Sequence, residues 1–492
     1  MRRGSQASPP AGAAGLSRRA WIGLALTGLA PRLALALVFL RFPIGLDDMY
    51  QYDMLARSLA AGNGYRWYAA ADVLPIQPYL ERVYGWDFEN QDLPENGFLT
   101  SFRAPGYPAF LAGIYALSGP EGRIAAARLA QAVLGAALAP LTAWLALRLG
   151  LASRAALLAG FVLALYPVLW MYPLGLGSEN LFLLLVVLGL IALLSSAQNP
   201  QPRSAILPAL TLAAGVLTRG VLAAFLPFAV YWLHRQRGWR HAAVLLGVSL
   251  AALLPWSLRN TWLNGRPSFV ETSAGYNMFV GYHPQGDGGF VAGIASIPLR
   301  FIDDGERDRW SMDQALQFIR SDPSLVPQRA LNRLVLLAGL EDRELVYFYS
   351  NGYFGPIPQP WLALAYMGLV LPWLVVAGAA PFGLAAAWEA AGRQRLGALL
   401  IVSLVASTLI GYLLILADAR FHLPLVAPLA CFAAAAWTTP RAKWRALSPW
   451  ARRFAWATLA LLVILWSADI ARQAPELIRV MSPGGHRLAL SY

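Results

Sequence analysis

Two adjacent carboxylates, Asp47 and Asp48, follow the first long apolar segment of the chain. A carboxylate at a boundary between membrane and water is partly desolvated, which raises its pKa and suits it to general-base catalysis. Two such groups side by side could also bind a divalent cation. An Asp in front of a helix is more often a cap for the free N–H groups of the first turn. The pair is therefore a candidate for catalysis or metal binding, with helix capping as the structural alternative.

Two further polar positions interrupt apolar sequence. Arg103 stands two residues before Pro105, which suits a first helical turn, and its guanidinium could bind a phosphate beside the free N–H groups of that turn. An arginine that meets lipid headgroups is the alternative. Arg420 and His422 are costly at a membrane edge without a partner. They could bind a lipid phosphate, with an Asp418–Arg420 structural pair as the alternative.

Other charged residues stand at the ends of apolar segments. Glu179 begins one segment and presents the same choice between a ligand contact and a structural pair, while Arg219 and Arg259 end others. His283 lies in a long polar segment and is a candidate substrate contact. Several arginines on one face beside acidic loops suit an anionic, lipid-linked ligand. The sequence contains no HExxH, P-loop, GxSxG or DxD motif.

The composition indicates which elements must position these side chains. Of the 492 residues, 58% are hydrophobic and 13% are charged, and the mean hydropathy is +0.50. Soluble domains carry about 25% charged residues, so the chain is neither an ordinary soluble enzyme nor a disordered protein. Apolar runs of about 20 residues recur, which is typical of an all-α polytopic membrane protein and not of a transmembrane β-barrel.

About eleven membrane spans are expected, within a range of 10 to 13. The candidate segments are residues 21–40, 124–147, 155–172, 178–196, 205–217, 221–233, 241–258, 360–388, 396–416, 422–437 and 454–470. The two short segments on either side of Arg219 could form a tight helical hairpin. Amphipathic helices are expected over residues 47–61 and 311–320, next to the membrane surface.

Basic residues in the short connecting segments set the expected orientation. The formal net charge is +13, and residues such as Arg18 and Arg237 cluster between apolar segments, which marks the cytoplasmic side and argues against nucleic-acid binding. The N-terminus is then cytoplasmic, provided that residues 105–117, which are too short to span, do not cross. Two long polar segments, residues 41–104 and 259–359, lie outside and hold 20 of the 26 acidic residues.

The expected organisation is therefore simple. It consists of a disordered cytoplasmic tail at residues 1–20, one transmembrane domain at residues 21–472, and an external tail at residues 473–492. Cys431 is the only cysteine, so the chain has no intramolecular disulfide. Two large loops on one face favour a catalytic or binding cap above a helical base.

Seven segments in this order carry a family resemblance. The chain resembles the bacterial branch of the GT-C membrane glycosyltransferases, in particular the family 39-like group of protein O-mannosyltransferases and aminoarabinose transferases, from about residue 21 to residue 437. The segments are Leu46–Arg57, Gly62–Tyr65, Arg103–Pro108, Gly177–Phe182, Leu217–Arg219, Pro255–Asn260 and Ala419–Pro424. Where the family has a Pro-Pro pair, this chain has Ala104-Pro105.

The resemblance implies an inverting transfer of a sugar from a polyprenyl-phosphate donor to an acceptor hydroxyl on a glycan, a lipid or a protein. The reaction would take place on the external face of the bacterial cytoplasmic membrane. Counting back from Tyr52, Asp48 matches the family's acidic residue, with Asp47 beside it. Members differ in metal dependence, so a divalent cation stays an open expectation. The expected substrate contacts are Arg103, Glu179, Arg219, Arg259, Arg420, His422, Tyr52 and His283.

Two other classes of function stay open. A transporter or flippase of lipid-linked sugars would move its substrate without breaking a bond, and usually has short loops and inverted repeats. A non-catalytic envelope-assembly protein could keep the same scaffold, and loss of both Asp47 and Asp48 would suit it. Both carboxylates are present.

Overall fold

The computed structural model describes residues 15–87 and 93–488 of the chain. The expected tails at residues 1–20 and 473–492 fall partly outside these ranges. The described chain is almost wholly helical, with one two-stranded antiparallel ladder that pairs Arg66 with Leu99 and Trp67 with Phe98. The all-α membrane fold class is confirmed.

Long helices, joined by short helical turns, form the base of the molecule. From the N-terminus these are α1 (Arg18–Val38), α5 (Gly106–Arg148), α6 (Ser153–Ala164), α7 (Val168–Met171), η2 (Tyr172–Leu174), α8 (Glu179–Ser196), η3 (Pro202–Ala205), α9 (Ile206–Thr218), η4 (Gly220–Phe225), α10 (Leu226–Arg237) and α11 (Trp239–Asn264). The C-terminal set is α17 (Gln359–Glu389), α18 (Arg393–Leu414), η6 (Ala419–His422), α19 (Leu423–Thr438), α20 (Arg441–Arg445), α21 (Pro449–Val480) and η7 (Gly485–Arg487).

The two polar segments fold into shorter elements. The first contains α2 (Asp48–Ala60), β1 (Arg66–Trp67), α3 (Ala70–Val73), η1 (Leu74–Ile76), α4 (Gln77–Tyr84) and β2 (Phe98–Leu99). The second contains α12 (Ala274–Tyr282), α13 (Ala292–Ala295), η5 (Ile297–Arg300), α14 (Asp304–Ser321), α15 (Leu325–Ala338) and α16 (Arg343–Ser350). Both expected amphipathic helices are present, as α2 and α14.

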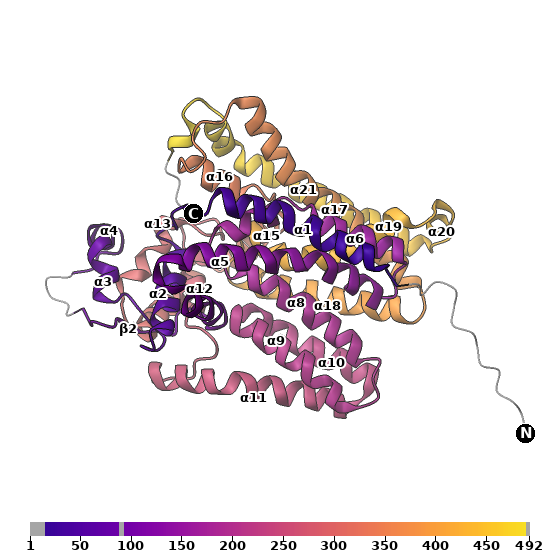
Figure 1. Ribbon diagram of the computed structural model, residues 1–492, viewed down its shortest axis with the longest axis horizontal. Coiled ribbons are helices and arrows are strands. Elements are labelled where there is room, and N and C mark those ends of the chain that lie inside the picture. Colours follow the sequence, from indigo (N-terminus) through magenta and orange to yellow (C-terminus); the bar gives the residue numbers. More distant parts are fainter. Residues whose placement is uncertain (1–14, 88–92, 489–492) are drawn as a thin grey trace, which may run out of the picture.

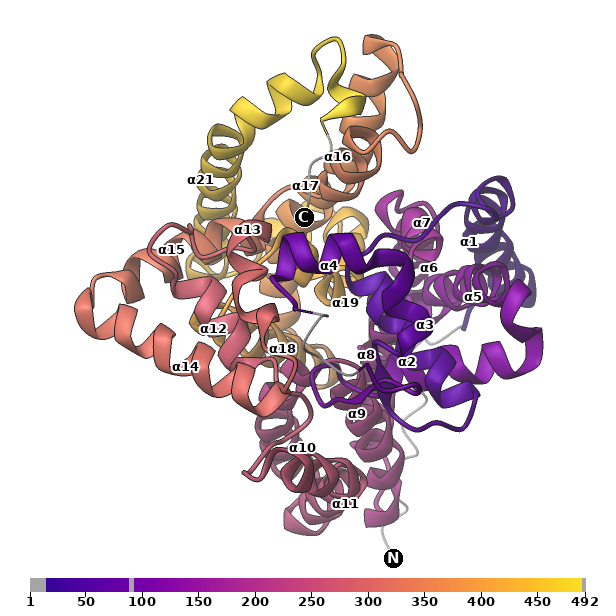
Figure 2. The ribbon, with the colours of Figure 1, turned by 90° about the vertical axis from the view of Figure 1, so that its left-hand side faces the viewer.

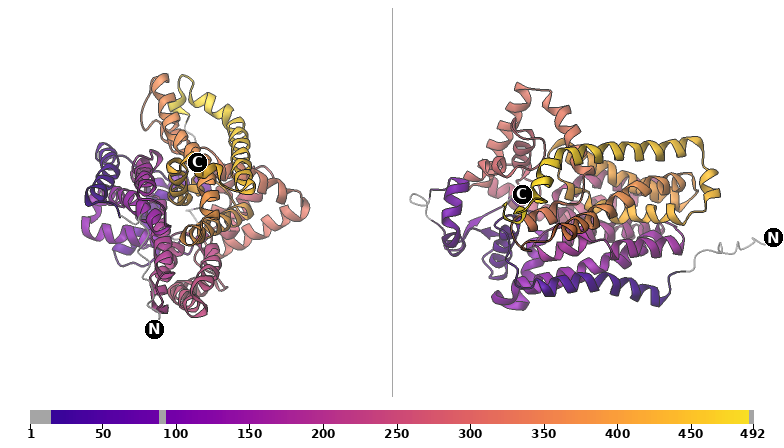
Figure 3. Two further views of the ribbon diagram at one scale, coloured as in Figure 1. Left: turned by 90° about the vertical axis from the view of Figure 1, so that its right-hand side faces the viewer. Right: turned by 90° about the horizontal axis from the view of Figure 1, so that it is seen from above.

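The short elements gather at one end of the helix bundle, which we call the loop end (Figure 1). Figure 2 looks onto this end and shows α2 to α4 beside α12 to α15. The connection α20 lies at the opposite end of the bundle, and the second view in Figure 3 shows the same separation. Segments far apart in the sequence therefore meet at the loop end.

Eight helices of the described chain are long and apolar enough to cross a membrane, and the bent pair formed by residues 153–164 and 168–174 would make nine. All eleven expected segments are helical. With the bent pair counted, the described chain has two candidate spans fewer than expected. The two missing spans are α9 and α10, which have only 13 and 12 residues, whereas about 20 are needed to span a bilayer. The chain is a multi-pass membrane protein.

Two helices run further than the apolar pattern indicated. The helix α5 starts at Gly106 and contains a break at Gly119, where φ is +72° and Pro120 follows. Residues 106–118 thus form a helical segment of their own, and whether they avoid crossing stays a prediction. The helix α21 continues to Val480, so residues 471–480 extend this helix, and the start of an external tail at residue 473 stays a prediction.

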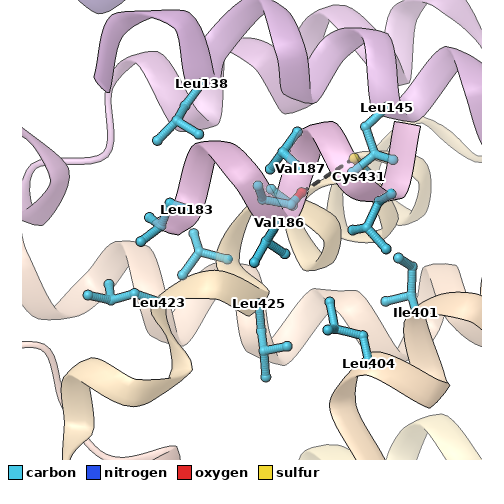
Figure 4. Packing of buried hydrophobic residues seen from close by; sticks show 14 of the residues in the cluster. Leu138, Leu145, Leu183, Val186, Val187, Ile401, Leu404, Leu423, Leu425 and Cys431 are labelled. Atoms are coloured by element: carbon cyan, nitrogen blue, oxygen red, sulfur yellow. Dashed lines mark hydrogen bonds between the residues drawn. The ribbon is translucent and has the colours of Figure 1, made fainter. Parts of the chain in front are cut away.

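The main apolar core lies where α5, α8, α18 and α19 meet. Leucine, isoleucine and valine side chains from these helices interdigitate, and the single cysteine is buried among them (Figure 4). The labelled members are Leu138, Leu145, Leu183, Val186, Val187, Ile401, Leu404, Leu423, Leu425 and Cys431. This packed base fixes the helix ends that carry the polar residues described next.

Candidate functional site

Eight charged side chains of the described residues form a continuous series of ion pairs, which we call the ion-pair chain. They come from α2, the segment after β2, the start of α8, the end of α9, the start of α16 and the turn η6. The members are Asp48, Arg103, Glu179, Arg219, Arg343, Glu344, Asp418 and Arg420. The site therefore joins both polar loops to the ends of the long helices.

Arg420 is the centre of the ion-pair chain. Its guanidinium lies 3.7 Å from Asp48 Oδ2, 3.8 Å from Glu179 Oε1 and 3.8 Å from Asp418 Oδ2. These separations exceed hydrogen-bond length, and the buried Nε of Arg420 has no hydrogen-bond partner within the described chain. The expected Asp418–Arg420 pair does form, since the backbone N–H of Arg420 also donates to Asp418 Oδ1 at 3.1 Å. Arg420 thus keeps guanidinium donors available for an additional anion.

Asp48 is the most exposed member, with 37% of its side chain accessible. It is the first residue of α2 and accepts a hydrogen bond from Arg103, whose guanidinium also donates to Gln51 Oε1 at 2.7 and 2.9 Å. Burial alone would raise the pKa of Asp48, but the charges of Arg103 and Arg420 outweigh it and lower that pKa. The expectation of a raised pKa is therefore wrong for Asp48, which is ionised at neutral pH.

Asp47 caps α2, as the structural alternative predicted. Its Oδ1 accepts a hydrogen bond from the backbone N–H of Met49 at 2.9 Å. Burial, followed by the negative charge of Asp48, raises the pKa of Asp47. The two neighbours therefore differ in both geometry and charge.

The pair Asp47 and Asp48 does not suit a metal ion. No group of three His, Cys, Asp or Glu side chains within residues 15–87 and 93–488 could hold one. Asp47 is occupied by the helix cap and Asp48 by Arg103, so the carboxylates do not converge on a common point.

Glu179 and Arg219 are in direct hydrogen-bonding contact within the ion-pair chain, as Asp48 and Arg103 are. Glu179 begins α8, and Arg219 follows the last residue of α9. The guanidinium carbon of Arg219 lies 5.3 Å from the ring centre of Phe421 and 5.9 Å from that of Phe182, within the range of cation–π attraction. For Glu179 the sequence left a choice between a ligand contact and a structural pair, and the structure shows the pair, with Arg219 as its partner.

Arg343 and Glu344 were missed by the sequence analysis. Arg343 lies 3.4 Å from Asp418 Oδ2 and 3.6 Å from Glu344 Oε1, and the hydroxyl of Tyr172 donates to Glu344 at 2.7 Å. The available signal was the charged run 341–344, which directly follows apolar sequence and whose last two residues begin the aromatic helix α16. Read as one of many loop charges, it gave no reason to pair with a turn 75 residues later.

Arg103 is held in place through its backbone. The hydroxyl of Tyr65 donates to the carbonyl of Arg103 at 2.9 Å and lies 3.2 Å from that of Ala104. Upstream, the hydroxyl of Thr100 and the N–H of Ser101 both donate to Asp304 Oδ2 at 2.6 Å. The second polar loop thereby fixes the strand that delivers Arg103.

Arg259 does not join the ion-pair chain. Its guanidinium donates to the carbonyl of Thr100 at 2.5 Å and to Asn260 Oδ1 at 2.9 Å, and it stacks 4.7 Å from the ring centre of Trp256. The expectation that Arg259 binds a phosphate is not supported by these contacts, because they use the guanidinium to hold the strand before Arg103. Its position at a helix end, read from the sequence, could not distinguish the two roles.

His422, two residues after Arg420, is buried, with 1% of its surface exposed. One ring nitrogen lies 2.9 Å from Glu341 Oε1 and the other 2.9 Å from the carbonyl of Leu337. The ring stacks on Trp373 at 3.8 Å. Both nitrogens are thus in use, and the expectation that His422 contacts a lipid phosphate is corrected: it supports the turn that carries Arg420.

The last two expected contacts lie in different surroundings. Tyr52 is buried, its ring packs edge-on against Tyr107 at 4.9 Å, and the guanidinium of Arg103 lies 5.7 Å from it, so it borders the site. His283 lies in the second polar loop and packs edge-on against Phe279 and Phe318. The structure does not bring His283 to the ion-pair chain.

Two arginines of α5 set the position of α2. Arg128 of α5 donates to the carbonyls of Phe39, Leu40 and Phe42 at 2.8 to 2.9 Å, which fixes the segment between α1 and α2. Arg123, also of α5, donates to Asp53 of α2 at 2.8 Å. These bonds explain why the start of α2 faces the ion-pair chain.

The chain is similar to known proteins in part of its sequence and in its fold. The family model for dolichyl-phosphate-mannose-protein mannosyltransferases matches residues 103–262. No curated protein sequence is significantly similar to the chain.

A solved structure of an archaeal oligosaccharyltransferase shares the fold. The AglB protein of Archaeoglobus fulgidus, solved with an inhibitory peptide and a dolichol-phosphate, superposes with a TM-score of 0.50 at 15% identity over 95% of this chain. The same organism's enzyme tethered to an acceptor peptide gives 0.48 at 14% identity over 97% of this chain. The chain spans about three fifths of these proteins, 58% and 60% of their lengths.

A bacterial structure matches more loosely. ArnT of Cupriavidus metallidurans, bound to undecaprenyl phosphate, gives a TM-score of 0.35 at 15% identity, over 85% of this chain and 78% of that one. The family match and the shared fold confirm the resemblance to the GT-C membrane glycosyltransferases that the sequence motifs indicated.

Proposed function

We propose that this GT-C-type membrane protein is a glycosyltransferase that moves a sugar from a polyprenyl-phosphate donor to an acceptor hydroxyl. The observation that carries the proposal is the ion-pair chain, in which the guanidinium of Arg420 lies 3.7 to 3.8 Å from three carboxylates, beyond hydrogen-bond length. Loosely paired arginines next to an exposed carboxylate combine a site for an anionic leaving group with a base. The family match and the shared fold support the same class of reaction.

The donor phosphate would bind between Arg420 and Arg103. About a fifth of each side chain is exposed, 21% for both, so a ligand can reach them. Arginine binds phosphate through two parallel N–H donors, which gives both strength and orientation. Arg219, paired with Glu179 beside Arg420, would add positive potential without direct contact.

The transfer would proceed as one inverting displacement. The acceptor oxygen forms a bond to the anomeric carbon while the bond from that carbon to the phosphate oxygen breaks. The electron pair of the broken bond leaves on the polyprenyl phosphate, whose charge Arg103 and Arg420 stabilise. The proton of the acceptor hydroxyl passes to the carboxylate of Asp48.

Donor binding would itself activate Asp48. In the free protein Arg103 and Arg420 lower the pKa of Asp48, which keeps it ionised but makes it a weak base. A bound phosphate takes up part of the positive charge of these arginines, so the pKa of Asp48 rises towards the range in which it accepts a proton. Asp48 would therefore become an effective base only when the donor is in place.

The proposal includes the membrane arrangement expected from the charges. The protein would lie in a bacterial cytoplasmic membrane with its N-terminus in the cytoplasm and the loop end outside. The sugar would be a hexose or a pentose, and the acceptor a hydroxyl of a glycan, a lipid or a protein. Residues 41–104 and 259–359 would form the external cap of the transmembrane domain.

The test is the release of free polyprenyl phosphate by the purified protein. Wild-type protein is incubated with polyprenyl-phosphate sugars and a cell-envelope acceptor fraction, and the lipid products are separated by mass. The rate should fall by about 10²- to 10⁴-fold in Asp48→Asn, because the variant lacks the proton acceptor. It should be retained in Asp313→Asn, which removes an exposed carboxylate of α14 at the same end of the bundle.

Two outcomes would contradict the proposal. If folded Asp48→Asn transfers sugar at the wild-type rate, Asp48 is not the base. If proteoliposomes move a lipid-linked sugar across the bilayer while no polyprenyl phosphate is released with any acceptor fraction, the protein is a transporter.

A further inference from the structure

An apolar groove lies at the end of the bundle opposite the ion-pair chain. It has a volume of about 480 Å³ and is lined by α17, α19, α20 and α21. The position of α20 in Figure 1 shows that this end is remote from α2 to α4. The volume falls within the range of about 300–1,000 Å³ that is typical of small-molecule sites.

The groove is lined almost entirely by apolar and aromatic side chains. Leu374, Gly378 and Phe382 of α17 form one wall, and Leu459 of α21 faces them. Trp444 of α20 closes the end, with its ring 5.0 Å from that of Phe382. Such a lining suits a hydrocarbon chain and offers no reason to hold water.

Two of the helices that line the groove are mostly uncovered by the rest of the protein. Only 33% of the apolar window of α17 and 22% of that of α21 is buried inside the protein, so hydrocarbon from the bilayer has direct access to the groove. Among the described residues that line it, Arg441 is the only charged one. A polar headgroup at Arg441 would therefore leave its tail inside the groove.

The charge around the mouth of the groove is strongly positive. Arg441, Lys443 and Arg445 of α20 are exposed, and Arg452 and Arg453 follow at the start of α21. In the described part of the chain, none of these five forms an ion pair with a carboxylate. Unpaired basic residues at a membrane surface attract anionic lipid headgroups, at about 1 kcal/mol for each residue.

We propose that this groove, formed by α17, α19, α20 and α21, binds one molecule of an anionic phospholipid. One acyl chain lies along the groove over Leu374, Gly378 and Phe382, and the phosphate group contacts Arg441. The argument rests on charge complementarity, since an apolar groove open to the lipid ends at five basic residues without acidic partners. The site is distinct from the ion-pair chain and does not depend on the proposed transferase activity.

The experiment uses the full chain in nanodiscs that contain a phosphatidylglycerol probe with a photoreactive acyl tail. After irradiation, labelled peptides are identified by mass spectrometry. Labels should map to residues 374–386 and to the neighbourhood of Leu459. A phosphatidylcholine probe with the same tail should label this region several-fold less, because its headgroup has no net charge.

Two pairs of variants give matched controls. Gly378→Leu places a side chain towards Leu459, whose Cδ1 lies 3.4 Å from a Cβ built at this glycine, and should reduce labelling severalfold. Gly368→Leu, in the same helix, has nothing within 4 Å of such a Cβ and should leave labelling unchanged. Arg441→Gln should lower labelling about fivefold, as expected for one basic residue, whereas Arg235→Gln, an exposed residue of α10, should not.

Four results would overturn the proposal. Equal labelling by the two probes would show that charge does not select the ligand. Unchanged labelling in both Gly378→Leu and Arg441→Gln would place the lipid elsewhere. Cross-links from the groove to a second copy of the chain would identify a protein interface. Displacement of the probe by an equimolar amount of polyprenyl phosphate would assign the groove to a different lipid.

Discussion

The helix α2 carries two carboxylates that belong to different kinds of arginine cluster. Asp53 is fully buried and accepts hydrogen bonds from Arg57 and Arg123 at 2.8 Å and from the hydroxyl of Tyr115 at 3.0 Å. Asp48, five residues earlier, is 37% exposed, and one of its two arginines stands 3.7 Å away. The residue types are the same, and the difference lies in how completely the charges are satisfied.

This difference separates a structural cluster from a binding site. In both clusters burial would raise the pKa of the carboxylate, and arginines outweigh it and lower that pKa. A pKa direction alone therefore does not distinguish them. Around Asp53 the guanidinium groups are bound at hydrogen-bond length, which leaves no room for a ligand. Around Asp48 the central arginine still has donors to offer, which is what an incoming phosphate requires.

The largest expected effect is a loss of stability at the structural cluster. Asp53→Asn removes the buried negative charge that Arg57 and Arg123 share, so Arg123 loses the carboxylate it pairs with while Arg57 keeps its ion pair with Asp72. Breaking a buried ion pair costs about 3–5 kcal/mol, so the free energy of unfolding in mixed micelles should fall by about that amount. Donor affinity of the folded fraction should stay unchanged. A stable Asp53→Asn protein that no longer binds the donor would break the comparison.

The next effect concerns the centre of the ion-pair chain. Arg420→Gln should weaken binding of a polyprenyl-phosphate donor by at least about 30-fold, which corresponds to about 2 kcal/mol for the loss of a charged hydrogen bond. The affinity can be measured by titration with a fluorescent donor analogue. The matched control Arg57→Gln alters the cluster of Asp53 and should leave the affinity of the folded protein within twofold. Equal losses in both variants would mean that the two clusters do not differ in function.

The sequence predicted the helices of this fold and the elements of its site better than the pairing within the site. Apolar segments of about 20 residues predict helices because a membrane leaves few alternatives, and every expected span is helical. Asp48, Arg103, Glu179, Arg219 and Arg420 were found because charge next to apolar sequence needs a partner.

The partners themselves depend on tertiary contacts that no local pattern encodes. Arg259 and His422 satisfy the same sequence criteria as Arg420, yet backbone carbonyls and Glu341 occupy them. The polar face of α2 would be expected to face solvent, but α5 covers it and buries Asp53. The raised pKa expected for Asp48 failed because it considered burial without the arginines that the fold brings in.

A third carboxylate extends the comparison to a buried acid that lies beside other acidic groups. Asp342 is 4% exposed, and burial, followed by the charge of Asp469 on α21, raises its pKa to about 7, with Tyr366 of α17 and Glu344 also near it. The unfolded value is about 3.9. Between these values the folded protein holds a proton that the unfolded chain has released. Stability should therefore fall as the pH rises from about 4 to 7, by at most about 1.4 kcal/mol per pH unit.

Asp342→Asn tests this pH dependence. The variant cannot ionise, so its unfolding midpoint, followed by tryptophan fluorescence in detergent, should change less between pH 5 and pH 7 than that of the wild type. It should also exceed the wild-type midpoint at pH 8. Asp313→Asn serves as the exposed control and should follow the wild-type curve. A parallel curve for Asp342→Asn would show that this buried acid is stabilised in some other way.

The smallest effect should come from the contact that holds Arg103 in position. Tyr65→Phe removes the hydroxyl that donates to the carbonyl of Arg103 at 2.9 Å, but keeps the ring that packs on Trp256 at 4.9 Å. A single neutral hydrogen bond contributes about 1 kcal/mol, so donor affinity should fall by about fivefold while the unfolding midpoint changes little. The stability of the cluster around Asp53 should be unaffected, because its guanidinium groups are bound within α2 and α5. If Tyr65→Phe lowers stability and leaves donor affinity unchanged, the strand before Arg103 stabilises the fold and does not position the site. The segment that holds Arg103 would then belong with the structural cluster around Asp53, and the binding site would be limited to the immediate neighbours of Asp48.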